Sequence, residues 1–249
     1  MERNSRCAAL ILNLRSVSEN NRVVTFLSDK RGIETALLYG GPKSKLRSLV
    51  SPFTSGTLWV YTNKNSSKIT DFHGEVFRNS FHESLFKSWA ATFCAELLIK
   101  TAAGGTDFEK IFSLINVFFD GMDKCTDEES RKALIRFLWR YQIFLGENPA
   151  TDNCCQCGCV LTDKAVFSPF PNGFLCQNCV AKTNFSQHGL FPVSAAGMNY
   201  LTGIEKLSPG KSRSLQIDED TLHQLKRLLF YLCEKSCNRK MQSVKVNFF

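Results

Sequence analysis

Long hydrophobic runs are missing from this 249-residue sequence, and none approaches the roughly 18 apolar residues that a membrane-spanning helix needs. The first apolar run extends only from Cys7 to Leu12, and Asn13 and Arg15 follow it. No small-residue cleavage site comes after it, so the run does not fit a secretory signal peptide. We therefore expect a cytoplasmic protein that does not engage a membrane.

The sequence also lacks the short motifs of several enzyme classes. It has no GxxxxGK[ST] phosphate-binding loop, no HExxH and no GxSxG, and it shows no defensible pair of catalytic carboxylates. Nucleotide hydrolysis and covalent catalysis are therefore not indicated, and we predict that the protein is not an enzyme.

The composition is that of a folded protein with an excess of positive charge. Hydrophobic residues make up 43% of the chain, which is enough to bury a core, and the formal net charge is +8. This charge suits a partner rich in phosphate, although a solvated basic surface gives the same number.

The first 79 residues are expected to form a small barrel. Five short segments are rich in β-branched and aromatic residues and are separated by turn-prone residues. The expected strands are 7–14, 22–29, 33–41, 56–63 and 67–77. Gly32 fits a turn residue with a positive φ between the second and third strands. Five strands without long helices suit an OB-fold or an SH3-like barrel, and strand count does not separate the two.

From residue 80 onward, apolar residues recur every three to four positions, which is typical of helices. Ser80 and Glu83 are spaced as a capping box before an apolar segment that continues to about Lys100, and "TDEE" (126–129) is a second capping box. Ser194 is expected to cap a short helix. A final amphipathic helix is expected from Asp218 to Lys235. The predicted organisation has four parts: 1–79, 80–150, 151–183 and 184–249.

Cysteines are concentrated in one short stretch. "CCQCGC" (154–159) and "CQNC" (176–179) hold six of the 11 cysteines in the chain. Pairing Cys154 and Cys157 with Cys176 and Cys179 gives two CxxC motifs separated by residues 158–175, which fits the roughly 15–20 residues typical of a zinc ribbon. Four thiolates are the usual donors of a structural zinc site. We predict these four residues as ligands and Cys155 and Cys159 as bystanders.

Other readings of the cysteines fit less well. An odd count in a reducing compartment argues against a disulfide framework. A redox CxxC usually stands alone, and iron–sulfur spacings are typically tighter. A catalytic zinc would keep an open position with His or Glu ligands, and His188 is the only histidine near the cluster.

The N-terminal region carries a surplus of basic residues, with nine Lys and Arg against four acids in residues 1–50. The densest piece is "GGPKSKLRS" (40–48), in which Lys43, Lys45 and Arg47 alternate. In an extended loop these three side chains would share one side and could contact phosphates without reading sequence. A solvated face explains the same residues. Bases could stack on aromatic residues of the barrel, although each of these is more typical of a core; the candidates are Phe26, Tyr39, Phe53, Trp59 and Tyr61.

In this order, the barrel, the helices, the inserted four-cysteine module and the last helix resemble the RecO family of bacterial recombination mediator and annealing proteins. The resemblance covers nearly the whole chain and is carried by four segments: 9–48, "CAELLIKTAAGGTDFEKIFSLI" (94–115), "FLGENPATDNCCQCG" (144–158) and "CNRKMQSVKV" (237–246). It implies an α+β protein with an N-terminal OB-fold and a helical domain that carries an inserted zinc module.

The resemblance also implies a function. Members bind single- and double-stranded DNA and anneal complementary strands coated with single-strand-binding protein, whose acidic C-terminal tail they contact. With RecR they help to load RecA, as part of the RecF pathway at the bacterial nucleoid. Carried over to this chain, the DNA-binding residues are Arg22, Arg31, Lys43, Lys45 and Arg47, and the structural zinc ligands are Cys154, Cys157, Cys176 and Cys179. The loop "YGGPKSK" here has fewer Arg and Lys than is usual in the family.

Two other functions remain open at this point. A zinc-ribbon adaptor in DNA repair would bind protein partners and have little DNA affinity of its own. A zinc-dependent nuclease would need an open metal position, which four thiolate ligands do not leave.

Overall fold

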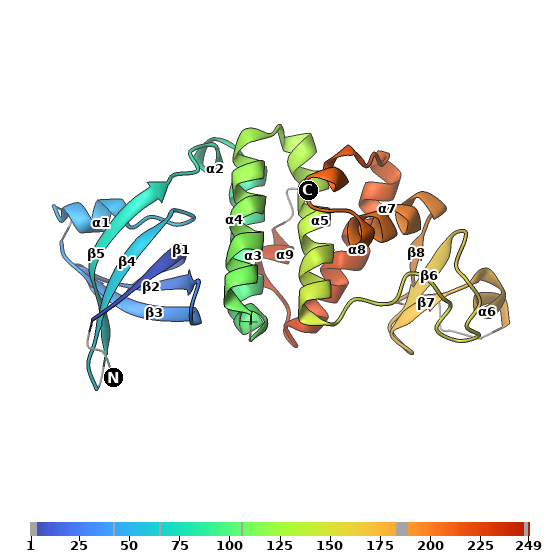
Figure 1. The fold of residues 1–249 in the computed structure, drawn as a ribbon, viewed down its shortest axis with the longest axis horizontal. Coiled ribbons are helices and arrows are strands. Elements are labelled where there is room, and N and C mark those ends of the chain that lie inside the picture. Colours follow the sequence, from blue (N-terminus) through green and yellow to red (C-terminus); the bar gives the residue numbers. More distant parts are fainter. Residues whose placement is uncertain (1–3, 42, 65, 106, 183–188, 247–248) are drawn as a thin grey trace. The chain divides into compact units, whose positions relative to one another are not determined.

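The computed structural model describes residues 4–41, 43–64, 66–105, 107–182, 189–246 and 249 (Figure 1). Contacts divide the chain into two compact units. The first contains Met1–Ser130 and Lys240–Phe249, and the second contains Arg131–Arg239. The predicted boundaries after residues 79 and 150 do not coincide with this division, because the helices that follow the barrel pack in the same unit as the barrel.

The first unit begins with a closed five-stranded barrel in the order β1-β2-β3-β5-β4. Its strands are β1 (Asn4–Ser16), β2 (Asn21–Ser28), β3 (Gly32–Tyr39), β4 (Ser55–Thr62) and β5 (Ser67–Val76). Pairing is antiparallel except between β3 and β5, and β4 returns to β1 to close the barrel. This arrangement is that of an OB-fold, as predicted.

Alternation along the strands fills the barrel interior. On β4, Leu58 and Val60 are 0% and 3% exposed, whereas Trp59 and Tyr61 point outward and are partly exposed. The interior also holds Phe26 and Phe72. Gly32 closes the turn between β2 and β3 with φ +74°, and a side chain at this position would collide with the ring of Phe108.

The basic segment after β3 is a short helix, α1 (Lys45–Leu49), and the expectation of an extended loop is wrong. The Ser44 hydroxyl accepts a hydrogen bond from the backbone N–H of Arg47, which caps the helix. Leu46 packs against the barrel core, and Val50 after the helix is 1% exposed. Burial of these two apolar side chains fixes the helix, so Lys45 and Arg47 do not share one side as they would in a strand.

Helices of the first unit follow the barrel. They are α2 (Ser80–Glu83), α3 (Leu85–Lys100), the 3₁₀ turn η1 (Ala102–Gly104), α4 (Phe108–Lys124) and α9 (Gln242–Lys245). The predicted capping box at Ser80 is wrong, because the long helix starts later. Ser84 caps α3 by accepting from the N–H of Lys87, and the Ser80 hydroxyl donates to Asp123 instead. The second predicted box is confirmed, since Thr126 and Glu129 bond to each other's backbone N–H.

Arg78 joins the barrel to α4. Its side chain is 1% exposed, and its five N–H groups all donate. The acceptors are the Phe53 carbonyl (2.6 Å), Ser55 Oγ (3.0 Å), Asn116 Oδ1 (2.9 Å) and Asp120 Oδ1 twice (2.6 and 3.0 Å). Every donor of the buried guanidinium is therefore satisfied, which offsets the cost of removing it from water.

The C-terminal segment packs onto α3. The indole N–H of Trp89 donates to the Ser243 carbonyl at 2.8 Å. Glu96 accepts from the backbone N–H groups of Gln242 and Ser243, from the Ser243 hydroxyl at 2.6 Å, and from Lys100. Burial acts to raise the pKa of Glu96, but these hydrogen bonds outweigh it and hold the pKa at about 2.

The second unit combines helices with a small sheet. Its elements are most of α5 (Asp127–Leu145), then β6 (Ala165–Ser168), β7 (Gly173–Leu175), α6 (Gln177–Lys182), β8 (Phe191–Val193), α7 (Ala195–Lys206), the 3₁₀ turn η2 (Lys211–Ser214) and α8 (Glu219–Ser236). The sheet order is β7-β6-β8. Ser194 caps α7 as predicted, and Asp218 caps α8, the expected final amphipathic helix. In the described part of the chain, no helix is both long and apolar enough to cross a membrane.

Candidate functional site

The two CxxC motifs meet in the second unit. Cys154 and Cys157 lie in the connection from α5 to β6, and Cys176 and Cys179 lie at the start of α6 directly after β7. The four sulfur atoms are all within 4.8 Å of one another, and the Sγ atoms of Cys157 and Cys176 are 3.8 Å apart. A tetrahedron with zinc–sulfur bonds of about 2.3 Å requires sulfur atoms about 3.8 Å apart. The donor set and its spacing therefore fit a tetrahedral metal ion.

Tight turns place the sulfur atoms. The N–H of Gly158 donates to the Cys154 carbonyl at 2.9 Å, and φ of +73° at Gly158 lets this turn close without a Cβ clash. The N–H of Cys179 donates to the Cys176 carbonyl at 3.1 Å in the second turn. Each CxxC motif thus points both of its thiols toward the same point.

The surroundings favour a thiolate at Cys154. Burial acts to raise its pKa, but backbone N–H groups directed at the sulfur, including that of Cys176 at 3.3 Å, lower the pKa to about 6. Zinc binds the thiolate form, so this arrangement prepares a ligand. Leu161, Leu175 and Val180 pack around the buried thiols of Cys154 and Cys179, whereas Cys157 is exposed.

The remaining two cysteines of the stretch have different positions. Cys155 is exposed, packs its side chain against Gly173 and donates its N–H to the Phe174 carbonyl. Cys159 is also exposed, and hydrogen bonds to the neighbouring thiols of Cys157 and Cys176 raise the pKa of its thiol to about 12. Cys159 thus lies beside the cluster, next to the thiols of Cys157 and Cys176.

Among the described residues, the group that could hold a metal consists of the four CxxC cysteines alone. His188, the histidine nearest in sequence, lies outside the described residues. Four thiols complete a tetrahedron, so this donor set leaves no position for a catalytic water.

Four of the five predicted DNA-binding residues lie at one end of the barrel. Asn21, beside Arg22, pairs with Tyr39, and Arg47 donates to the carbonyls of Gly40 and Glu19. Arg15, which the sequence pattern did not single out, is exposed opposite Val23 on the same hairpin. We call this group the basic end; its members are Arg15, Arg22, Lys43, Lys45 and Arg47.

The side chains of the basic end differ in solvent exposure and in the contacts that they make. Lys43 and Lys45 are exposed and make no ion pair with another described residue. Arg47 is partly buried, and its guanidinium holds the β1–β2 loop against the start of the α1 segment. The two lysine side chains are therefore exposed to solvent, while Arg47 has a structural role.

Arg31 lies apart from the basic end, in the turn at the other end of β2. It forms an ion pair with Glu34 at 3.0 Å and donates to Ser5 Oγ at 3.1 Å. The pairing with Glu34 neutralises part of its charge. The structure thus brings Arg22, Lys43, Lys45 and Arg47 together and leaves Arg31 separate from them.

Comparison with known proteins adds the family relationship. Residues 1–74 match the family model described as Recombination protein O N terminal, and residues 82–245 match Recombination protein O C terminal. A curated relative named DNA repair protein RecO from Bacillus pumilus (strain SAFR-032) is 24% identical over 255 residues, covering 95% of this chain and 94% of the relative. Proteins of the same name are 26% identical in Syntrophomonas wolfei, over 81% of this chain and 82% of that protein, and 25% identical in Clostridium perfringens, over 95% and 94%.

Proposed function

The chain belongs to the RecO family of DNA repair and recombination proteins, and from this premise we propose that it is a mediator that binds DNA and anneals complementary single strands. The observation that carries the proposal is the match of both family models to consecutive parts of the chain, of which the first is the OB-fold barrel with its basic end. The proposed action requires no catalytic residues and no ATP.

The basic end is proposed to hold the phosphates of one strand. Neutralising phosphates with Lys and Arg lowers the repulsion that keeps a second strand away, and it releases counterions. If three to five of the cations at the basic end engage single-stranded DNA, log K falls against log salt with a slope of about −2 to −3.5. Affinity then drops about 20- to 100-fold between 50 and 200 mM salt.

The four-cysteine cluster is proposed to hold one structural zinc ion, with Cys154, Cys157, Cys176 and Cys179 as ligands. Zinc would supply a cross-link between the two CxxC turns. The segment from residue 151 to 182 has a small apolar cluster around Cys154, Leu175 and Cys179, together with the buried ring pair of Phe167 and Phe174. A metal cross-link is how such short segments are commonly stabilised.

The proposed partners follow from the family. They are single- and double-stranded DNA, the acidic C-terminal tail of single-strand-binding protein, and RecR, through which RecA is loaded onto coated strands. The expected site of action is the bacterial nucleoid in the cytoplasm. Recruitment by the tail would bring the protein to coated DNA before annealing starts.

Annealing of two complementary oligonucleotides coated with single-strand-binding protein tests the proposal directly. The reaction is followed without ATP across a salt series, with and without the protein. We expect acceleration that falls steeply as salt rises. Absence of acceleration at every salt concentration, with folded and zinc-loaded protein, would refute the annealing function.

The competing function is an adaptor that binds protein partners and has little DNA affinity. A Lys43→Glu, Lys45→Glu double variant separates the two, because the side chains of these lysines are exposed and make no ion pair with a described residue. The mediator function predicts loss of naked single-stranded DNA binding in this variant. A Lys206→Glu, Lys211→Glu variant changes net charge equally at exposed positions of the second unit and serves as the control. Partner binding without DNA binding by the unmodified protein would favour the adaptor.

A further inference from the structure

On the outer face of the barrel, a positively charged side chain lies over each of two aromatic rings. Trp59 and Tyr61 alternate on β4 and are both partly exposed. The guanidinium of Arg6 lies over the Trp59 ring at 5.4 Å, and the ammonium of Lys68 lies over the Tyr61 ring at 5.1 Å. Arg6 on β1 and Lys68 on β5 are the direct cross-strand partners of these aromatic residues.

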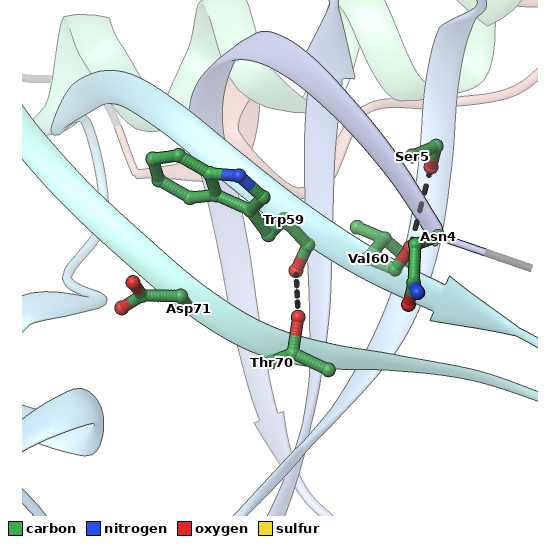
Figure 2. A pocket seen from close by; sticks show the side chains of 6 residues that line it. All are labelled: Asn4, Ser5, Trp59, Val60, Thr70 and Asp71. Carbon is green, nitrogen blue, oxygen red and sulfur yellow. Dashed lines mark hydrogen bonds between the residues drawn. The ribbon is translucent and has the colours of Figure 1, made fainter.

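A shallow pocket of about 320 Å³ opens beside Trp59 on the same face (Figure 2). It is lined by residues of β1, β4 and β5: Asn4, Ser5, Trp59, Val60, Thr70 and Asp71. The hydroxyls of Ser5 and Thr70 donate to backbone carbonyls of β4, at 3.3 and 3.2 Å, and are already engaged. Asp71 Oδ1 accepts a hydrogen bond from the N–H of Phe72 at 2.9 Å, so the polar groups left to meet a ligand are the amide of Asn4 and the second carboxylate oxygen of Asp71, on the strands that flank Trp59.

Arg31 adds a cation at the edge of this pocket. Its guanidinium donates to Ser5 Oγ, one of the pocket residues. The residue that the structure separates from the basic end therefore contacts one residue of the pocket lining. Arg6 and Lys68, the cross-strand partners of Trp59 and Tyr61, supply positive charge that attracts phosphate, whereas the carboxylate of Asp71 repels it.

We propose that this face, made of Arg6, Trp59, Tyr61, Lys68 and Asp71, binds single-stranded nucleic acid by stacking unpaired bases on the two rings. The inference rests on the proposed DNA-binding function and adds a site to it. Aromatic side chains beside cations are the means by which single strands are held without sequence reading. The Asp71 carboxylate turns the strand so that a base, which offers N–H groups on its unpaired edge, enters the pocket and the phosphates stay at the rim.

The spacing of the rings suits two nucleotides. Residues two apart on a strand are separated by about 6.8 Å, which is twice the rise of about 3.4 Å per nucleotide in a stacked strand. Bases on Trp59 and Tyr61 would therefore be unstacked from each other. A duplex cannot offer such bases, so the face selects single strands.

Stability alone is a weak explanation for this arrangement. An exposed cation–π pair contributes only about 0.5–1 kcal/mol, and the barrel interior is filled without either ring. OB-folds often bind nucleic acid on the face of strands 2 and 3. Within β2 and β3, both described throughout, Tyr39 is the one exposed aromatic residue, at 51%. The paired rings occur on β4 instead.

The test compares the unmodified protein with a Trp59→Leu, Tyr61→Leu double variant, using fluorescein-labelled oligo-dT and a duplex of equal length in anisotropy titrations. We expect single-strand affinity to fall at least tenfold with an unchanged salt slope, since stacking on one aromatic residue changes affinity by about 5- to 150-fold. Duplex binding should stay unchanged. Trp59→Phe keeps a ring and should restore most of the affinity. Phe170→Leu removes an exposed aromatic ring of the second unit and is the matched control.

Tryptophan fluorescence gives a second readout. Trp89 and Trp139 are 6% and 0% exposed, so quenching by unlabelled oligo-dT reports on Trp59. The proposal is overturned if the unmodified protein binds oligo-dT without quenching, or if the double variant binds it normally. Equal loss on single strands and duplex would also overturn it, because stacking on free bases cannot produce that result. An unmodified protein that binds no DNA at all would instead show that the proposed function has failed.

Discussion

Replacing Arg78 with methionine is predicted to loosen the barrel from α4. The substitution keeps an apolar chain of similar length and removes the buried guanidinium, which donates five hydrogen bonds. The Phe53 carbonyl, Ser55 Oγ and Asn116 Oδ1 then lose a charged donor. Burial already lowers the pKa of Arg78, although Asp120 counteracts this.

The magnitude follows from how the partners are exposed. Removing one partner of a buried ion pair costs about 3–5 kcal/mol, largely because the other partner is left unpaired. Here the side chain of Asp120 is 43% exposed and regains water, so the lower end applies. We expect a loss of about 3 kcal/mol in the free energy of unfolding of the first unit, or about a 150-fold change in its unfolding equilibrium.

Native-state hydrogen exchange is the suitable assay, because a chain with two compact units need not unfold in one transition. Amides of β4 and α4 should lose protection in Arg78→Met, while those of the second unit keep it. Arg31→Met removes an ion pair whose side chains are 47% and 25% exposed, and it should cost less than about 1 kcal/mol. If Arg78→Met costs no more than Arg31→Met, the reasoning about the buried network is refuted.

Two further predictions concern the metal cluster and acid stability. Cys176→Ser should abolish binding of one zinc ion per chain, measured by elemental analysis, and should expose residues 151–182 to protease. Cys159→Ser should retain the metal. Zinc retention by Cys176→Ser, or zinc loss by Cys159→Ser, would contradict the ligand assignment. For Glu96, the folded pKa of about 2 lies below the ordinary 4.5, so its stabilisation is complete above about pH 4.5 and is lost as pH falls toward 2. The difference in urea stability between the unmodified protein and Glu96→Gln should be on the order of 2 kcal/mol at neutral pH and shrink toward pH 2, and a difference that does not depend on pH would contradict this cause.

Local patterns in the sequence predicted the elements that depend on neighbouring residues. All five strands were placed to within a few residues, because alternation and turn residues determine them. Helix α1 was missed because it is only five residues long and forms where Leu46 and Val50 find the barrel core, which is a tertiary effect. The start of α3 was misplaced by four residues, since Ser80 and Ser84 are both chemically suitable caps and packing chooses between them.

In the candidate sites too, local sequence patterns predicted some residues, and tertiary structure determined the others. The spacing of the two CxxC motifs was sufficient to select the four cysteines that the structure brings together. The basic end was only partly foreseen, because Arg15 joins it through strand pairing with β2 and Arg31 leaves it for the opposite turn. The aromatic face depends on cross-strand register, which places Arg6 beside Trp59 and is not readable from one strand.

The packing of residues 240–246 onto α3 has a consequence for the order in which the protein can mature on the ribosome. Glu96 and Trp89 are synthesised well before Gln242 and Ser243, which provide their partners. At about 5–20 residues per second, the roughly 110 residues between the two parts of the first unit take about 5–20 s to translate. Through this interval the nascent barrel and its helices present an uncovered seam on α3. The first unit therefore cannot complete its packing until the second unit has been synthesised.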